Sequence, residues 1–280
     1  MDLQSIIDSI VKLPPSPQIL PKLQTLLRDV DAGIHDIISL LKVDAPMTAQ
    51  IVRLSNSAYF GASSPSQSLE EAVTRLGFRE VYKVVSMAAA NQVLGDAVPV
   101  YNMGKGQLLQ HSIACAVVMV ECSARRLSGN LDSAYTIGLL HSLGKVIINQ
   151  YYLKHGLEIY SSDGGEDLDV EMERKILGFD YAEAGAAILR KWNFPAEIYE
   201  PIEYQYNPTM APDHSTFASM LAIARWGADF LVQDKGNDSP IPIYDGNPTY
   251  LELTGLAFDE LNDCMCNARE GLKELDELVR

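Results

Sequence analysis

Apolar residues recur every three to four positions along most of the chain, whereas the alternation of apolar and polar residues typical of strands is nearly absent. A capping box, Ser68 to Glu71, begins one such segment, and Gly77 follows its end. The pattern therefore predicts an all-α protein, with a short helix before Leu13. Further helices are expected over about 17–29, 34–43, 46–57, 68–76, 78–94, 107–128, 131–142, 144–160, 169–177, 181–192, 195–206, 213–233 and within 249–279.

Two polar segments interrupt the helical pattern and suggest three divisions of the chain. Gly95 to Gly106 contains three glycines and a proline, and Asp234 to Pro248 is rich in Gly, Pro, Asn and Asp. We expect an N-terminal helical half over 1–95, a second helical half over 96–233, and a loop with a C-terminal helical extension over 234–280. The apolar stripe of the last helix should pack on its own domain; if exposed, it would dock a partner helix.

Composition and charge narrow the range of partners. The chain has 280 residues, of which 47% are hydrophobic, and its 22 basic against 37 acidic residues give a net charge of −15. Such an acidic chain is not expected to bind nucleic acid or anionic lipid. The N-terminus has no signal-peptide pattern, and the longest apolar run, Ile113 to Val120, is too short to span a bilayer, so we expect a cytoplasmic protein without membrane contact. Four cysteines are too few for a disulfide scaffold, and Cys115 and Cys122 share a helix face typical of core packing.

The segment Gly138 to Lys145, with His141 followed by Ser142, is the first candidate for chemistry. An adjacent His-Asp pair is a good metal-binding unit, because a neutral imidazole and a carboxylate supply two ligands together. Ser142 offers only a neutral hydroxyl. The alternative is structural: His141 bonds a neighbouring carbonyl at a helix end, and Ser142 caps the next helix.

Three stretches carry a family resemblance. Asp44 to Gly61 contains an Asn56-Ser57-Ala58 turn, Glu71 to Gly77 follows it, and a third stretch runs from His111 to Asp229. Together these resemble the HDOD domain, a relative of the HD metal-dependent phosphohydrolases that usually lacks their complete metal site. The resemblance covers about residues 10–233 and implies a multi-helix HD-like bundle with an N-terminal helical subdomain and a C-terminal extension. Asn56, Ser57 and Gly61 are expected to shape a helix end.

The resemblance places metal-ligand positions along the second half of the chain. His111, His141 and Asp229 retain ligand types, but Ser142 replaces the aspartate, Tyr181 replaces a histidine, and Gln205-Tyr206 replaces a His-His pair. A phenol with an unperturbed pKa of about 10 is a poor ligand. We therefore expect no cofactor, although His111, His141 and Asp229 would suffice for a single weakly bound divalent ion. A buried His-Asp hydrogen-bond network would explain the same three residues.

The seven positions can also form a pocket. His111, His141, Ser142, Tyr181, Gln205, Tyr206 and Asp229 would converge in an HD-like fold, and their donors, acceptors and aromatic walls would suit a small polar ligand. Alternatively, the tyrosines fill the space that metals occupy in the enzymes.

The sequence thus predicts a non-catalytic, bacterial-type signal-transduction module that acts through contacts with signalling proteins or through a small ligand. We assign no catalytic residue. The chain shows no fused receiver, cyclase or kinase segment, so a stand-alone module is expected. The alternative is a divergent metal-dependent phosphohydrolase that uses His111, His141 and Asp229. Because several ligand positions differ, restoring aspartate at Ser142 alone should not restore catalysis.

Overall fold

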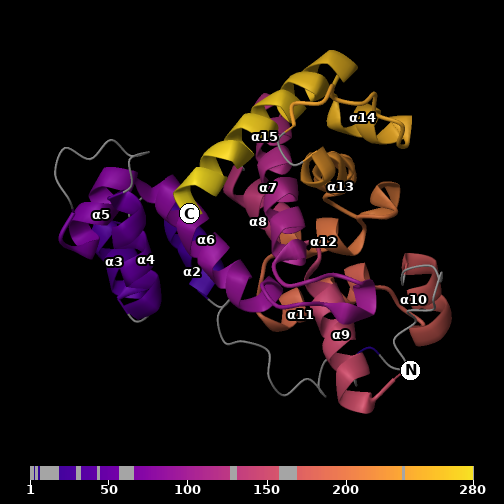
Figure 1. Cartoon of the computed structure of the whole chain (residues 1–280), viewed down its shortest axis with the longest axis horizontal. Coiled ribbons are helices and arrows are strands. Elements are labelled where there is room, and N and C mark those ends of the chain that lie inside the picture. Colours follow the sequence, from indigo (N-terminus) through magenta and orange to yellow (C-terminus); the bar gives the residue numbers. More distant parts are fainter. Residues whose placement is uncertain are drawn as a thin grey trace.

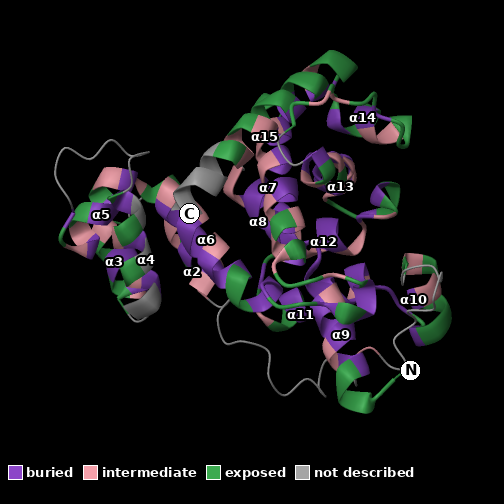
Figure 2. Ribbon diagram, in the orientation of Figure 1, coloured by how far each residue is buried: buried purple, intermediate pink, exposed green. Residues whose placement is uncertain are grey.

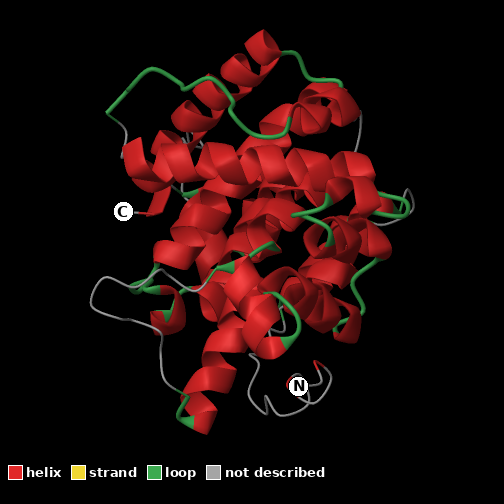
Figure 3. Cartoon of the chain, turned by 90° about the vertical axis from the view of Figure 1, so that its right-hand side faces the viewer, coloured by secondary structure: helices red, strands yellow, loops and turns green. Residues whose placement is uncertain are grey.

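The computed structural model describes residues 3, 6, 19–29, 33–42, 45–56, 66–126, 131–157, 169–234 and 237–279. Within these ranges the chain forms helices and no strands, which confirms the all-α prediction (Figure 3). The predicted helix before Leu13 lies mostly outside the described residues, and Ser57 and Gly61 lie wholly outside them. The helices are α2 (Ile19–Arg28), α3 (Ile34–Leu41), α4 (Ala45–Ser55), α5 (Leu69–Leu76), α6 (Phe78–Leu94), α7 (Gln107–Arg126), α8 (Leu131–Leu140), α9 (Leu143–His155), α10 (Val170–Leu177), α11 (Tyr181–Lys191), α12 (Ala196–Glu203), α13 (Ser215–Asp234), α14 (Pro248–Thr254) and α15 (Phe258–Val279), with single turns η3 (Pro99–Tyr101) and η4 (Pro208–Met210).

Helices α2 to α6 form the N-terminal group, which lies on one side of the molecule (Figure 1). A buried polar contact joins this group to the rest of the chain. Thr136 of α8 accepts a hydrogen bond from the side-chain amide of Gln24 at 3.3 Å and also bonds the hydroxyl of Tyr82. Because all three side chains are buried, these hydrogen bonds fix the positions of α2 and α6 against α8.

Two local predictions about the N-terminal group need correction. Ser68 accepts a hydrogen bond from the Glu71 N–H at 3.1 Å, but the Glu71 carboxylate accepts from the Gln67 N–H rather than from Ser68, so the capping box is only half formed. The sequence predicts that Asn56 shapes a helix end through a bond to its own backbone. Its side-chain amide instead makes two hydrogen bonds to the backbone of Ser66, ten residues later. These bonds connect the end of α4 to the residues just before α5.

The second group is centred on α7, α8 and α13; α12 packs on α8 and α13, α11 packs on α12, and α9 packs on α11. Figure 2 shows that buried residues concentrate in these helices. Two glycines allow the helices to approach closely. A Cβ on Gly138 would lie 2.5 Å from Cα of Ala116 in α7, and a Cβ on Gly144 would lie 1.8 Å from the carbonyl oxygen of Tyr181. Neither position has room for a side chain.

Helix α7 is long and apolar enough to cross a membrane by length and composition, and among the described helices it alone passes that test. Half of the relevant window is buried inside the protein. Helices α6, α8, α13 and α15 all contact α7. Its apolar composition is therefore accounted for by its central position in the fold.

The C-terminal section contains two helices, because Gly255 adopts a φ of 69° between α14 and α15. Helix α15 lies along α7, and the apolar stripe predicted for it faces the core at Leu261, Met265 and Ala268, all of which are buried. Over this part of the helix the stripe packs on its own domain, as expected. The side chains further along, including those of Leu275 and Leu278, lie outside the described residues.

Candidate functional site

Four of the predicted site residues lie in turns, not within helices as the sequence pattern suggested. Helix α8 ends at Leu140, just before His141 and Ser142, and α12 ends at Glu203, just before Gln205 and Tyr206. In both turns a side chain bonds the carbonyl three residues earlier. Nδ1 of His141 lies 2.7 Å from the Gly138 oxygen, and Nε2 of Gln205 donates to the Ile202 oxygen at 3.0 Å. Such bonds compete with the backbone N–H groups that would extend each helix.

The structure brings the seven predicted residues into one region between α7, α8, α11, α12 and α13. His111 of α7 and Asp229 of α13 form a hydrogen bond of 2.9 Å between Nε2 and Oδ1. Because a carboxylate only accepts, Nε2 of His111 is the donor. The side chain of Asp229 is 64% exposed, so the pair is not the buried network that the sequence allowed. Partial desolvation raises the pKa of Asp229, but the hydrogen bond from His111 and the charge of Arg225 leave it below its usual value.

His141 lies beside His111, with the ring centroids 5.3 Å apart, and is buried. Burial, the neighbouring His111 ring and the positive charge of Arg225 hold the pKa of His141 well below its ordinary value, so the ring is neutral. The Gly138 carbonyl can only accept a hydrogen bond, which places the proton on Nδ1 and the lone pair on Nε2. The structural explanation of His141 as a helix-end histidine bonded to a carbonyl matches this geometry.

Ser142 occupies the position before α9 but makes no capping hydrogen bond with its side chain. The prediction that it caps the helix is therefore wrong. Its hydroxyl instead bonds the hydroxyl of Ser112, which lies 30 residues earlier in α7, at 2.6 Å. Both serines are buried, so they form a neutral pair at the position where the resemblance leads one to expect a carboxylate.

Tyr181 and Tyr206 form the other side of the site. Their hydroxyls are 2.7 Å apart and their rings meet edge to face, with an interplanar angle of 86°. Burial raises the pKa of both phenols, more strongly for Tyr181, so both are neutral. The side chain of Gln205 joins this turn to α8, because its Nε2 also donates to the carbonyl of His141 at 3.2 Å.

Two cationic residues of the site have no role in the sequence prediction. Arg225 of α13 donates from Nη2 to the Tyr206 hydroxyl at 2.6 Å, and its guanidinium lies 4.1 Å from the centroid of that ring. Nζ of Lys145 lies 5.0 Å from the ring centroids of both Tyr101 and Tyr181. Arg225 is four residues before Asp229, a spacing that places both on one face of α13 and could have indicated its role.

A buried carboxyl holds Tyr181 in place. Glu173 of α10 accepts hydrogen bonds from the Tyr101 hydroxyl at 2.5 Å and from the Tyr181 N–H at 2.6 Å. Burial raises the pKa of Glu173 to about 7. Asp180 then caps α11 by accepting from the Glu183 N–H at 2.9 Å, while Glu183 accepts from the Asp180 N–H in return. Tyr181 is thus the first residue of a well-defined helix.

Comparisons with known proteins now place the chain. The sequence model of the HDOD domain family matches residues 13–208, well over half of the chain. The protein belongs to the HDOD family. The HDOD chain is 25% identical over 232 residues to an uncharacterized protein of Treponema pallidum (strain Nichols); that stretch is 81% of this chain and 44% of the relative, so the chain spans under half of that protein.

Solved structures share the HDOD fold. A Geobacter sulfurreducens HDOD domain protein of unknown function superposes with a TM-score of 0.73 at 23% identity, covering 98% of this chain and 96% of that one. A candidate phosphohydrolase from Shewanella amazonensis SB2B gives 0.69 at 23% identity, covering 98% of both chains. A candidate signal-transduction protein from Marinobacter aquaeolei VT8 gives 0.72 at 20% identity, covering 98% of this chain and 61% of that one. At these identities the likeness concerns the fold alone.

The donor set of this HDOD site does not fit a two-metal centre. In the described part of the chain, no three His, Cys, Asp or Glu side chains are grouped so as to hold a metal ion. The serine pair and the tyrosine pair are neutral, and Nε2 of His111 already donates to Asp229. Arg225 adds a fixed positive charge, which repels a divalent cation placed nearby.

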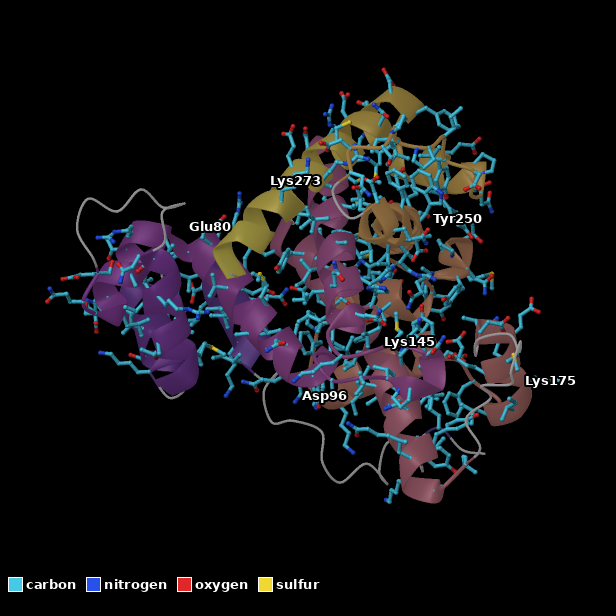
Figure 4. All side chains as sticks on the ribbon, in the orientation of Figure 1. Glu80, Asp96, Lys145, Lys175, Tyr250 and Lys273 are labelled. Carbon is cyan, nitrogen blue, oxygen red and sulfur yellow. The ribbon has the colours of Figure 1, made fainter. Side chains whose placement is uncertain are left out.

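Next to the tyrosines the surface is hollowed by about 400 Å³. Lys145, Tyr181 and Tyr206 form part of the wall, and the start of α10, with Asp169 and Glu171, forms the rest. Figure 4 labels Lys145, which lies where α9 begins near α10. His111, His141 and Asp229 do not line this hollow, so the tyrosine half of the site borders the open space.

Proposed function

We propose that this HDOD protein is a non-catalytic regulatory module of signal transduction, which acts through contacts with signalling proteins and through a small ligand at the tyrosine pair. A cytoplasmic location belongs to the same proposal. The observation that carries it is the hydrogen bond from Arg225 to Tyr206, at a position where the HD resemblance leads one to expect a metal-binding histidine. The guanidinium of Arg225 places a positive charge where a metal ion would otherwise supply it, but it does not act as a metal ligand.

The hydrogen-bonding capacity of the tyrosine pair supports a polar ligand. The two phenols carry two O–H hydrogens, of which one is used in the bond between them. Arg225 adds a donor to Tyr206 and fills one acceptor site. The second O–H therefore needs an acceptor from outside the pair. Because Lys145, Asp169 and Glu171 line the same hollow, a small ligand with both acceptor and donor groups suits it best.

The second candidate is a divergent metal-dependent phosphohydrolase with one weakly held ion. It is favoured by the tautomer of His141, whose Nε2 lone pair is left as a ligand atom beside His111. For His111 or Asp229 to bind the same ion, their mutual hydrogen bond would have to break, or the residue would have to bind the ion through an atom that this hydrogen bond does not use.

Metal analysis and turnover assays separate the two candidates. The protein is purified without chelator, its Mn, Fe, Ni and Zn contents are measured, and hydrolysis of phosphomonoesters and phosphodiesters is assayed with each metal added. We expect substoichiometric metal and no turnover. A stoichiometric metal together with turnover that is lost in His141→Ala would overturn the proposal.

The ligand is tested by thermal shift, because a compound that binds only the folded protein raises its melting temperature. A screen of small polar metabolites should give hits whose shift disappears in Tyr206→Phe and persists in Tyr204→Phe, the neighbour in the same turn. Hits that survive Tyr206→Phe would place the ligand elsewhere.

A further inference from the structure

A second hollow, of about 340 Å³, lies on another face of the protein, between α13, the loop before α14, and the start of α15. Its walls are almost entirely apolar and include Trp226, Ile241, Tyr244 and Leu261. The Trp226 and Tyr244 rings meet edge to face at 5.1 Å, so the floor is a packed aromatic surface. None of these residues contributes to the site described above.

The rim of this hollow exposes large apolar side chains. Ile243 is 85% exposed, the highest value among the large hydrophobic residues of the described chain, and Phe258 is 58% exposed. Figure 2 shows the outer face of α15 mainly in the colour of exposed residues, whereas α14 carries buried, intermediate and exposed residues. Apolar side chains gathered around an apolar hollow mark an interaction surface, whereas single exposed ones do not.

The loop that carries Ile243 is held in a fixed, extended form. Pro240 and Pro242 restrict its backbone on either side of Ile241. At one end, Arg269 donates to the Ser239 carbonyl at 2.6 Å; at the other, Nε1 of Trp226 donates to Asp245 at 2.9 Å. Because the loop is ordered in advance, a partner that binds here loses little affinity to loop ordering.

The charge around the hollow indicates the nature of the partner. Four acidic residues each lie next in sequence to a residue that lines this hollow: Asp245, Asp259, Glu260 and Asp263. Glu260 and Asp263 pair with Arg126 and Arg125, and Asp245 accepts a hydrogen bond from Trp226. A second copy of the same surface would bring like charges together, and an anionic membrane would be repelled in the same way. A partner segment that carries basic residues beside apolar ones complements both the charge and the apolar character of this surface.

We propose that this hollow, named here the Ile243 groove and formed by Trp226, Ile241, Ile243, Tyr244, Phe258 and Leu261, docks a basic amphipathic segment of a partner protein. An aliphatic or aromatic side chain of that segment enters the hollow against Trp226, and its lysines or arginines face the acidic surroundings. The inference rests on the proposed function of the protein as a module that works through protein contacts, and it specifies the surface and the chemistry of the contact.

A defined probe tests this surface. The probe is an amphipathic helical peptide of leucine and lysine, and binding is followed by the fluorescence of the protein, which has two tryptophans, one of them in the groove. Two further peptides are compared: one of the same composition with the amphipathic order scrambled, and one with glutamate in place of lysine. We expect binding of the first peptide only, and a fluorescence change that is absent in Trp226→Phe.

Matched variants locate the binding. Ile243→Ser and Phe258→Ser should each weaken binding about tenfold or more, because each removes a large apolar contact without changing charge. Leu153→Ser is the control, since Leu153 of α9 is 56% exposed and lies outside the groove. Equal binding by all variants, or equal binding of the scrambled peptide, would overturn the proposal, as would a dimer in sedimentation that Ile243→Ser dissociates. Metal content and turnover of the same variants report on the proposed function separately.

Discussion

Arg225 and Trp226 are consecutive residues of α13 whose side chains serve two different surfaces. Arg225 donates to the Tyr206 hydroxyl at 2.6 Å, whereas Trp226 donates to Asp245 at 2.9 Å and forms part of the Ile243 groove. Consecutive helical residues point about 100° apart, which is enough to separate the two surfaces. Helix α13 is therefore the element shared by the tyrosine pair and the groove.

The hydroxyl of Tyr206 should contribute measurably to stability, because it bonds both Tyr181 and Arg225. Tyr206→Phe removes both hydrogen bonds and leaves a guanidinium donor without its acceptor, so we expect a loss of about 1–3 kcal/mol in the free energy of unfolding. Urea unfolding measures it. In a double-mutant cycle with Arg225→Met, the two losses should not add. Tyr204→Phe is the control, with an expected change within about 0.5 kcal/mol; additive losses in the cycle would show that the Arg225 bond has no energetic role.

Gly144 sets the distance between α9 and α11, and so the position of Lys145 against Tyr181. A Cβ at this position would lie 1.8 Å from the Tyr181 carbonyl oxygen, and the obstructing atoms belong to backbone. Gly144→Ala should therefore destabilise the protein by at least about 2 kcal/mol. Gly271→Ala in α15 is the control: its nearest contact would be 3.5 Å, so the better helix propensity of alanine should leave stability equal or higher. Equal stabilities of the two variants would contradict the packing described for α9 and α11.

Ser142→Asp alone should not create a phosphohydrolase. The hydroxyl of Ser142 is buried against Ser112, and the neighbouring positions 181, 205 and 206 still lack ligands. A buried carboxylate there costs desolvation energy, so we expect a lower melting temperature and no metal-dependent turnover. Ser142→Ala, which loses one hydrogen bond, should be destabilised by only about 1 kcal/mol. If Ser142→Asp hydrolysed phosphate esters, the substitutions at positions 181, 205 and 206 would not be what prevents catalysis.

The sequence predicts the helical fold, because the helical period can be read along the chain. It also predicts which residues meet at the site, because the family motifs assign positions in the chain to that site. It also allows the correct partner for His141, since a carbonyl three residues earlier is a local contact. The spacing of Arg225 and Asp229 places both on one face of α13, but it does not identify Tyr206 as the partner of Arg225. Arg225 acquires its role only when the turn that carries Tyr206 packs beside α13, and that is a tertiary contact. The Ile243 groove likewise depends on how a loop without periodicity lies against α13 and α15.

Glu173 should make the stability of the protein depend on pH. Burial raises the pKa of this carboxyl from its ordinary value of 4.5 to about 7, although hydrogen bonds from Tyr101 and the Tyr181 N–H lower it in part. The folded state therefore holds the proton more tightly than the unfolded state. The resulting stabilisation is fully present below about pH 4.5 and is lost as the pH rises through about 7, with a total on the order of 3 kcal/mol.

Glu173→Gln removes this titration, because a glutamine does not ionise. We expect the wild-type protein to lose free energy of unfolding between about pH 5 and about pH 8, and the variant to lose markedly less over the same range. Glu171→Gln is the matched control, since Glu171 lies two residues earlier in α10 and is exposed, so its pH dependence should follow the wild type. Urea unfolding at both pH values gives the three slopes. The same slope for Glu173→Gln and the wild type would contradict this prediction. Glu173 would then be ionised in the folded protein throughout this range, and its buried charge between Tyr101 and Tyr181 would not lower the free energy of unfolding.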